Sequence, residues 1–224
     1  MRLIVPMYHR ASAGRYGNAP EVLDAHFAHI ARSFHGVMPG ESLHPERVNV
    51  CLTFDDGTRD FRDVVYPLLR KHRLRAVLAV PLGFLQDGPR NAQAYCSWAD
   101  LEEMIGEGVV SVAAHGFTHR RLDIGTADLH AEIAVPQTVL AARLGCAVES
   151  FVLPYGRFSD DVLAEARRHY RYIFRIGGAD NTGWDGPLIY RVDADAMTAP
   201  DALFARGNLL SYRLRRRWNL ARRR

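Results

Sequence analysis

Short apolar runs alternate with longer segments of helical periodicity along most of this sequence. Several of the apolar runs contain almost no polar residue, as is typical of strands buried on both faces. An alternation of this kind indicates βα units arranged around a parallel sheet. We expect seven strands, at residues 3–7, 48–54, 76–80, 109–114, 150–153, 172–176 and 188–192.

Five helices are expected between these strands, at residues 21–34, 63–73, 98–107, 127–144 and 160–169. Ser97 or Asp100 is suited to cap the third helix, and Gly145 stands where a glycine commonly ends the fourth. The chain has 224 residues, of which 48% are hydrophobic, and neither a repeat nor a Ser/Gly-rich linker divides it. We therefore expect a single folded domain with a sizeable core.

Cysteine usage and hydropathy exclude several classes of protein. Cys51, Cys96 and Cys146 are far apart and form no CxxC pair, so neither a disulfide framework nor a cysteine-ligated zinc site is expected. No stretch approaches the roughly 20 apolar residues of a transmembrane helix. The first apolar run is broken by Pro6 and ended by His9, which makes it too short for the core of a signal peptide. A cytoplasmic location follows as an expectation.

The first candidate for chemistry is the pair Asp55 and Asp56, which follows the strand expected at residues 48–54 and precedes Gly57. Adjacent carboxylates repel each other unless a cation or a proton lies between them. An Asp-Gly dipeptide is also among the commonest turn sequences, so this pair on its own favours a surface turn.

A second candidate is the pair His115 and His119, which again follows an expected strand. Two histidines four positions apart face the same way on one helical turn, and imidazole is a common ligand of Zn²⁺. Alone, such a pair is more often solvated or packed. Two histidines and one aspartate together make three ligands, and catalytic zinc sites combine three ligands with an open position for water. The two motifs therefore indicate a catalytic metal site.

A third candidate is the turn Pro154, Tyr155 and Gly156, at the end of the fifth expected strand. Pro154 fixes the backbone and Gly156 relieves crowding, so the Tyr155 N–H is suited to donate to a developing oxyanion. An ordinary Pro-Tyr-Gly turn is the alternative. Two loops rich in Gly, Pro, Asn and Asp, at residues 83–95 and 177–187, also follow expected strands and are candidate walls of a pocket.

These motifs resemble those of the polysaccharide deacetylases of carbohydrate esterase family 4. The family's T-F-D-D-G motif is intact at residues 53–57, and its H-[ST]-x-x-H motif is present at residues 115–119 with Gly in the second place. Pro-Tyr-Gly matches the centre of its third motif, and Met-Tyr-His-Arg at residues 7–10 is similar to the first strand of one branch. The resemblance extends over residues 3–192. It implies a distorted (β/α)7 barrel of parallel strands, which we assign to residues 1–205.

The resemblance also implies a reaction and a set of roles. The family removes acetyl groups from N-acetylated sugars with a divalent metal, which we expect to be Zn, with Co, Ni, Mn or Fe as alternatives. Asp56, His115 and His119 would hold the metal. Asp55 would be the general base that takes a proton from the attacking water.

Two positions depart from the family pattern. The family has an Arg that orients the base at the position of Val152, and a His that protonates the leaving amine near the position of Arg191. A guanidinium does not give up its proton near pH 7, so Arg191 is not the acid. We expect Arg191 to pair with Asp55 in place of the missing Arg. His9 is then the best candidate for the acid, with a buried, hydrogen-bonded histidine as the alternative.

Substrate contacts are expected from three residues. Pro154 and Tyr155 take this role by resemblance, and the Tyr155 N–H would share the oxyanion with the metal. Trp184, in the loop at residues 177–187, would stack on a sugar ring. A loop aromatic that only covers the protein is the alternative for Trp184.

Arginine is concentrated in a tail at residues 206–224. Eight of the 29 basic residues lie there without any acidic residue, so the tail carries +8, while the remaining 21 basic and 25 acidic residues leave −4 on the body. Leu210, Leu214, Trp218 and Ala221 recur at helical spacing. A basic amphipathic tail fits an anionic membrane surface, such as the inner face of the cell membrane, and a solvated terminus is the alternative. Nucleic acid is not expected, because the body is acidic and has no recognised binding motif.

The sequence thus predicts a metal-dependent hydrolase that removes the N-acetyl group of an amino sugar, on a lipid-linked or nucleotide-linked glycan. Two alternatives stay open. One is a catalytically silent carbohydrate-binding protein of the same fold, because two family residues are replaced. The other is a metal-dependent amidase that acts on a non-sugar C–N bond.

Overall fold

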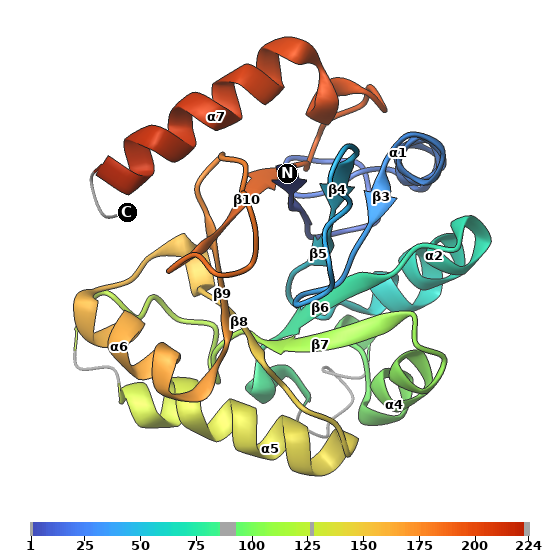
Figure 1. Cartoon of the computed structure of the whole chain (residues 1–224). Helices are drawn as coiled ribbons and strands as arrows, with labels where there is room; N and C mark the ends of the chain where they lie inside the picture. The colour runs from blue at the N-terminus through green and yellow to red at the C-terminus, as the bar shows by residue number, and fades with distance from the viewer. Residues whose placement is uncertain (1, 86–92, 126–127, 222–224) are drawn as a thin grey trace.

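Seven parallel strands close into a barrel at the centre of the molecule (Figure 1). The computed structural model describes residues 2–85, 93–125 and 128–221. Around the barrel the strand order is β10-β2-β5-β6-β7-β8-β9. Their bounds are Pro6–Tyr8 for β2, Leu52–Phe54 for β5, Ala76–Val80 for β6, Val110–Ala114 for β7, Ser150–Val152 for β8, Tyr172–Ile176 for β9 and Ile189–Asp193 for β10. The expected (β/α)7 barrel is therefore confirmed.

Two of the expected strands are each divided between two sheets. The run at residues 3–7 becomes β1 (Arg2–Ile4) and β2, and the run at residues 48–54 becomes β4 (Val48–Val50) and β5. β1 and β4 join the short strand β3 (His35–Gly36) in a separate three-stranded sheet. The change of partner occurs at Val5, where the carbonyl accepts a hydrogen bond from the Val192 N–H at 2.9 Å. Hydropathy carries no sign of such a change, because β1, β2, β4 and β5 are mostly buried.

The expected helices surround the barrel (Figure 1). They are α1 (Pro20–Ser33), α2 (Tyr66–His72), α4 (Trp98–Gly106), α5 (Val135–Leu144) and α6 (Asp160–His169). Single π-helical turns, Phe61–Val65 and His130–Ala134, lead into α2 and α5. Residue 127, the first of the expected fourth helix, lies outside the described residues.

Local capping signals set two helix boundaries as expected. Of the two proposed caps, Ser97 takes the position: its Oγ accepts the Asp100 N–H at 3.2 Å, and an Asp100 carboxylate oxygen accepts the Ser97 N–H at 2.8 Å. Gly145 ends α5 with φ 62°, a left-handed conformation that glycine adopts without steric cost.

The barrel interior is apolar near the amino ends of the strands and charged near their carboxyl ends. Alternate side chains of β6, Val77 and Ala79, belong to an interior cluster, whereas Leu78 and Val80 pack toward the helices. Arg191, near the carboxyl end of β10, is fully buried. The core therefore supports a polar site at one end of the barrel.

The loop at residues 177–187 does not build that polar end. A parallel strand must start at the same end as its neighbour, so this connection runs back from the end of β9 to the start of β10. Asn181 pairs with Leu3 through two backbone hydrogen bonds of 2.9 and 2.8 Å, near the amino ends of the strands. The expectation that this loop forms a wall of the site is wrong for that reason.

One further helix, α7 (Arg206–Ala221), lies outside the barrel near β9 and β10 (Figure 1). The tail's residues 222–224 lie outside the described residues, and the division of the chain into a body and a tail remains a prediction. None of the helices in the described ranges combines the length and the apolar character that a membrane span requires.

Candidate active site

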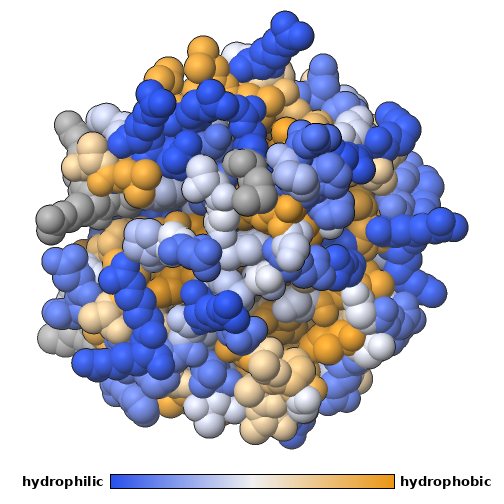
Figure 2. All heavy atoms as spheres, viewed as in Figure 1, coloured by the Kyte–Doolittle hydropathy of each residue, from blue (hydrophilic) through white to orange (hydrophobic). Residues whose placement is uncertain are grey.

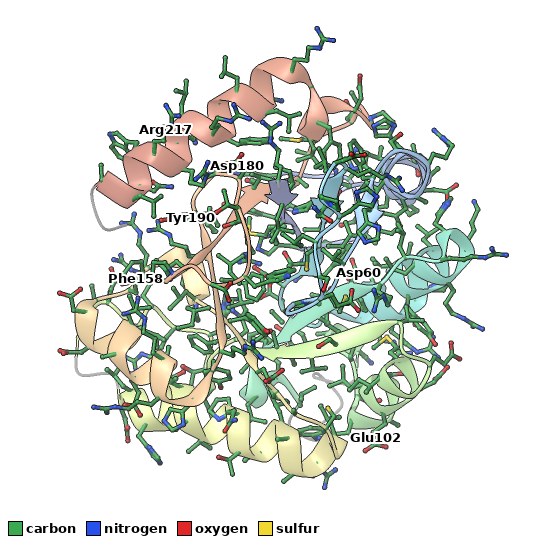
Figure 3. The ribbon with its side chains drawn as sticks, in the orientation of Figure 1. Asp60, Glu102, Phe158, Asp180, Tyr190 and Arg217 are labelled. Atoms are coloured by element: carbon green, nitrogen blue, oxygen red, sulfur yellow. The ribbon has the colours of Figure 1, made fainter. Side chains whose placement is uncertain are left out.

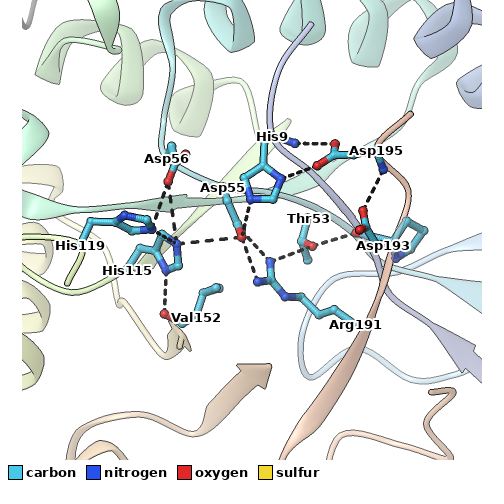
Figure 4. Close-up of polar contacts among 11 residues, drawn as sticks. His9, Thr53, Asp55, Asp56, His115, His119, Val152, Arg191, Asp193 and Asp195 are labelled. Atoms are coloured by element: carbon cyan, nitrogen blue, oxygen red, sulfur yellow. Dashed lines mark hydrogen bonds and ion pairs between the residues drawn. The ribbon is translucent and has the colours of Figure 1, made fainter. Parts of the chain in front are cut away.

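The predicted site residues gather where the strands end, because the carboxyl ends of parallel strands meet at one mouth of the barrel. Asp55 and Asp56 follow β5, and His115 and His119 follow β7. His9 follows β2, and Arg191 reaches in from β10. Figure 4 shows these side chains converging from four strands. The structure thus brings them together, and their chemical roles remain predictions.

Three of the gathered residues have a left-handed backbone. The φ angles are 71° at Asp56, 56° at His119 and 58° at Tyr155. Such a conformation costs a residue with a side chain about 1–2 kcal/mol, and it persists only where the surrounding structure enforces it. These turns therefore direct the side chains toward the mouth of the barrel, although residues with a side chain rarely adopt a left-handed backbone conformation.

Asp56, His115 and His119 present one ligand atom each toward a common point. The Nε2 atoms of the two histidines are 3.1 Å apart, and Asp56 Oδ1 lies 3.4 Å from His119 Nε2 and 3.9 Å from His115 Nε2. Ligands bound at about 2.1 Å to one tetrahedral ion are roughly 3.4 Å apart. Asp56 Oδ1 is buried without a hydrogen-bond partner among the described residues. The three side chains therefore fit a divalent metal.

A hydrogen bond prepares His115 to be a ligand. Its Nδ1 lies 2.7 Å from the Val152 carbonyl oxygen, which can only accept, so Nδ1 carries the proton and Nε2 keeps its lone pair. Burial, against the opposing charge of Asp55, lowers the pKa of His115 to about 4. The imidazole is thus held neutral, as a metal ligand must be. Val152, where the family has an Arg, contributes through its backbone.

The loop that carries the two histidines is held by a residue that sequence reasoning missed. Glu132, buried in the π-helical turn before α5, accepts the Phe117 and Thr118 N–H groups at 2.9 and 3.0 Å and the Thr118 hydroxyl at 2.6 Å. The only available signal was an acidic residue inside an otherwise apolar helical segment. Glu132 positions the loop and does not itself reach the three ligand atoms.

Asp55 and Arg191 form the expected pair, wholly inside the barrel. Arg191 Nη1 and Nη2 donate to the two Asp55 carboxylate oxygens at 2.6 and 2.9 Å, and both side chains are at most 3% exposed. Burial alone would raise the pKa of Asp55, but Arg191, with His115 and His9, holds that pKa well below its ordinary value. Asp55 therefore stays ionised.

His9 lies beside Asp55, and Asp195 fixes the orientation of its imidazole ring. The imidazole Nδ1 of His9 is 2.6 Å from Asp195 Oδ2, and the backbone N–H of His9 donates to Asp195 Oδ1 at 3.1 Å. The other ring nitrogen, Nε2, is 3.7 Å from Asp55 Oδ2. Burial alone would lower the pKa of His9, but the hydrogen bond to Asp195 and the charges of Asp55, Asp195 and Asp56 raise it above the ordinary value.

Sequence reasoning missed Asp195 as well. It stands 186 positions from His9 and reaches it because β10 pairs with β2, with Asp193 beside Met7. Two aspartates separated by one residue directly after the last strand were the available signal. A carboxylate behind an imidazole is the arrangement that orients a histidine for proton transfer.

Aromatic rings surround the mouth of the site. Tyr155 is 55% exposed and its ring centroid lies 4.9 Å from that of His119, while Phe84 stands 6.0 Å from the same imidazole. Tyr16, 60% exposed, lies 6.2 Å from His9. Pro154 is buried beneath Tyr155. The loop expected at residues 83–95 is described only in part, because residues 86–92 lie outside the described residues. Phe84 belongs to the described part of this loop.

Trp184 is not brought to this site. Its ring is 8% exposed and packs at 5.9 Å against Tyr172, the first residue of β9. Its indole N–H donates to the Glu41 carbonyl at 2.9 Å. Trp184 thus closes the opposite end of the barrel, and the sugar-stacking role expected for it is not supported.

Comparison with known proteins agrees with this architecture. The family model described as polysaccharide deacetylase matches residues 44–173, and no curated protein matches the chain. One similar solved structure is the Streptococcus pyogenes deacetylase PplD in complex with acetate. The two sequences are 23% identical, the match covers 95% of the present chain and 98% of PplD, and the TM-score is 0.79. IcaB from Ammonifex degensii has 21% identity, 87% and 92% coverage, and a TM-score of 0.77. The polysaccharide deacetylase BC0361 from Bacillus cereus has 18% identity, 90% and 67% coverage, and a TM-score of 0.78.

The TM-scores of 0.77 to 0.79 show that these proteins share the fold. The family model spans more than half of the 224 residues and includes the segments that carry Asp55, Asp56, His115, His119 and Tyr155. On that match, the chain belongs to the polysaccharide deacetylase family.

Proposed function

We propose that this protein is a metal-dependent hydrolase that removes the N-acetyl group from an amino sugar of a lipid-linked or nucleotide-linked glycan. The observation that carries the proposal is the convergence of three ligand atoms beside an ionised carboxylate that is not one of the ligands, with an imidazole on its far side. Cleavage of an amide needs a proton acceptor for water and a proton donor for the amine, and this site offers one of each.

Asp56, His115 and His119 would hold the metal. When bound, a divalent ion would supply Lewis-acid chemistry, since it lowers the pKa of water and polarises a carbonyl oxygen. We propose Zn on the strength of the two imidazoles and one carboxylate, a ligand set common in catalytic zinc sites.

Asp55 would take the proton of the attacking water through Oδ2. That oxygen lies 2.9 Å from Arg191 Nη2, and it stands 3.9 Å from His115 Nε2 and 3.7 Å from His9 Nε2. A carboxylate oxygen has two lone pairs, so Oδ2 keeps one for the water while Arg191 occupies the other. Arg191 thereby orients the base, the role expected for it from the sequence.

His9 would protonate the leaving amine. Its Nε2 faces the site while Asp195 holds Nδ1, and its raised pKa keeps the protonated form available near neutral pH. Water gives its oxygen to the acetyl carbon, one proton to Asp55 and its second proton to solvent as the acid product ionises, while the C–N bond breaks and the amine receives a proton from His9. Loss of the Asp55 proton to solvent and uptake of a proton by His9 restore the site. Acetate and the free amino sugar are the products.

The rim of the site suits a sugar ring. Tyr16 and Tyr155 expose aromatic faces on the two sides of the site, beside His9 and His119 respectively, and aromatic faces stack on the apolar face of a sugar. The Tyr155 N–H, in its left-handed turn, would donate to the oxyanion.

Acetate release by purified protein tests the proposal. Metal-loaded protein is incubated with N-acetylated sugar oligomers, a nucleotide-linked N-acetyl sugar and a lipid-linked one, and acetate is measured. We expect release that stops on chelation, returns with added Zn²⁺, and is lost in His119→Ala but kept in His169→Ala, a change on the surface helix α6. Stoichiometric metal without release from any substrate would favour the silent binder or the amidase. Release that survives His119→Ala would overturn the assignment of the site.

A further inference from the structure

Helix α7 exposes several of its large apolar side chains to solvent. Among the described residues eight large apolar side chains are well exposed, and four of them lie on this helix: Leu210, Leu214, Trp218 and Leu220. A helix that packs on a globular domain normally does the reverse and buries its apolar side. The exposed row on α7 therefore needs an explanation.

Polar contacts and the packing of Leu209 and Tyr212 against the core hold α7 on the barrel. Tyr212 and Asn219 are its buried residues, and the Asn219 side-chain amide donates to the Gly177 carbonyl at 3.2 Å. Arg216 Nε donates to Asp180 Oδ1 at 2.9 Å, which ties the helix to the loop after β9. Because these contacts use the opposite side of the helix, the outward row is a property of the folded protein.

The outward side combines an apolar row with positive charge. Leu210, Leu214 and Trp218 are spaced four residues apart and are 57%, 56% and 49% exposed. Arg213 and Arg217 lie next to this row, one helical turn apart. In Figure 2, orange and deep blue side chains lie side by side along the upper edge, where Figure 1 places α7.

A hollow of about 480 Å³ lies beside this row, and five of its ten lining residues are arginines. Asp180 lines it and pairs with Arg216 at 2.9 Å and with Arg2 at 3.5 Å. Asp180 and Arg217, two of its lining residues, are labelled in Figure 3. Its arginines are Arg2, Arg47, Arg213, Arg216 and Arg217. Since Asp180 and Glu46 are the acidic residues in this lining, the hollow has an excess of positive charge and matches a phosphate group.

We propose that α7 docks on an anionic lipid bilayer. Leu210, Leu214 and Trp218 would enter the headgroup region, and Arg213 and Arg217 would contact lipid phosphates. Apolar residues with Trp on one side and arginines beside them are the pattern of helices that lie in a membrane interface. A nucleic acid would make no use of an exposed leucine row. The inference stands independently of the proposed deacetylase activity.

Flotation of the whole protein with vesicles tests the proposal. Vesicles of phosphatidylcholine alone are compared with vesicles that also contain phosphatidylglycerol, at low and at physiological salt. We expect binding to the anionic vesicles only, and weaker binding as salt rises. Arg213→Gln/Arg217→Gln should bind roughly 30-fold more weakly, because each basic side chain near the surface contributes a factor of about five.

Two further variants separate charge from apolar contact. Leu214→Ser/Trp218→Ser should lose the binding that persists at physiological salt, and circular dichroism checks that this variant is folded. The matched control Arg32→Gln/Arg73→Gln removes the same charge from exposed positions on and after other helices and should bind as the unaltered protein does.

Four results would overturn the proposal. They are no binding to anionic vesicles, equal binding to neutral ones, an equal loss in the control variant, and a monomer–dimer equilibrium that Leu214→Ser/Trp218→Ser abolishes while vesicle binding is unchanged.

Discussion

Asp55 is the residue on which the chemistry of this site depends. Its two carboxylate oxygens face Arg191 at hydrogen-bonding distance, with the imidazoles of His9 and His115 less than 4 Å from Oδ2. Each neighbour arrives from a different strand, so one buried carboxylate joins the ligand side of the site to the proton-donor side. Two groups of predictions belong at this scale, one on the buried ion pair and one on the proton donor.

The first concerns the buried ion pair. Arg191→Met should destabilise the protein by about 3–5 kcal/mol, because it leaves the Asp55 charge buried without a partner. The double variant Asp55→Leu/Arg191→Met should recover much of that loss, since neither charge then remains. Urea unfolding of Arg191→Met, Asp55→Leu and the double variant measures the free energy of unfolding of each. A double variant no more stable than either single one would contradict this account, and unchanged turnover in Arg191→Met would refute the orienting role.

The pair also has a defined pH dependence. Since the folded-state pKa of Asp55 is lowered, its stabilising effect is present above the ordinary carboxylate pKa of about 4 and is lost as pH falls below that value. The stability difference between Arg191→Met and the unaltered protein should therefore shrink as pH falls below about 4, because protonation of Asp55 removes the unpaired charge in the variant; urea unfolding at several pH values, followed by far-UV circular dichroism, measures this difference.

The second group of predictions at this scale concerns the proton donor. His9→Gln should lower kcat on an N-acetylated sugar by roughly 10²–10⁴-fold. It should change hydrolysis of 4-nitrophenyl acetate far less, because that leaving group departs without a proton. An equal loss on both substrates would mean that His9 is not the acid.

Asp195→Asn tests the same donor through its pKa. His9 must be protonated to act, and Asp195 helps to raise its pKa, so removing the carboxylate should move the alkaline limb of the kcat–pH profile to lower pH. Asp201→Asn, an exposed change, should leave the profile in place. Asp55 and Asp56 also face His9 and are unaltered in both variants, so a shift specific to Asp195→Asn isolates its effect.

At the scale of elements, the loops that follow the strands hold strained backbones in place through contacts with neighbouring helices. The loop after β7 is the clearest case. Gly116 turns with φ 77°, His119 with φ 56°, and Glu132 accepts three hydrogen bonds from the residues between them. Ligand geometry is therefore set by a buried carboxylate on the next helical segment.

Glu132→Ala should weaken metal binding by about 10–100-fold, the usual cost of losing a group that orients a ligand. Competition for Zn²⁺ with a chromophoric chelator measures the affinity directly and does not depend on turnover. Glu132→Gln should recover part of the affinity, because its carbonyl oxygen can still accept the two N–H groups. Glu102→Gln, a change at an exposed position on α4, is the control. An unaltered Zn²⁺ affinity in Glu132→Ala would show that Glu132 is not needed to position the ligands.

At the scale of the whole molecule, the three ligands join loops after two different strands, so a bound ion would link β5 to β7 and stabilise the barrel. At a free Zn²⁺ concentration 100 times Kd, the gain is about 2.7 kcal/mol, equivalent to a rise in Tm of roughly 5–10 °C for a chain of this size. Differential scanning calorimetry should show this rise in the unaltered protein and not in His119→Ala. The same rise in both proteins would place the ion elsewhere.

Much of the fold follows from short-range signals. The barrel strands β6 and β9 and the helix α6 begin and end where periodicity predicts, and Ser97 and Gly145 cap their helices as expected. The ligand candidates were also visible, because Asp55–Asp56 and His115–His119 are local motifs at strand ends. Periodicity and capping depend on residues only a few positions apart, and a sequence displays those directly.

Only the tertiary structure decided which distant residues meet. Asp195 reaches His9 across 186 positions, a contact that was not expected, and the Arg191–Asp55 pair, which was expected, spans 136 positions. Both contacts require β10 to close the barrel against β2. The same closure carries Trp184 to the far end of the barrel and leaves the apolar row of α7 outside. Barrel closure depends on strand register over the whole chain, so the sequence by itself determined the elements and the ligand motifs, while the fold determined which groups complete the site.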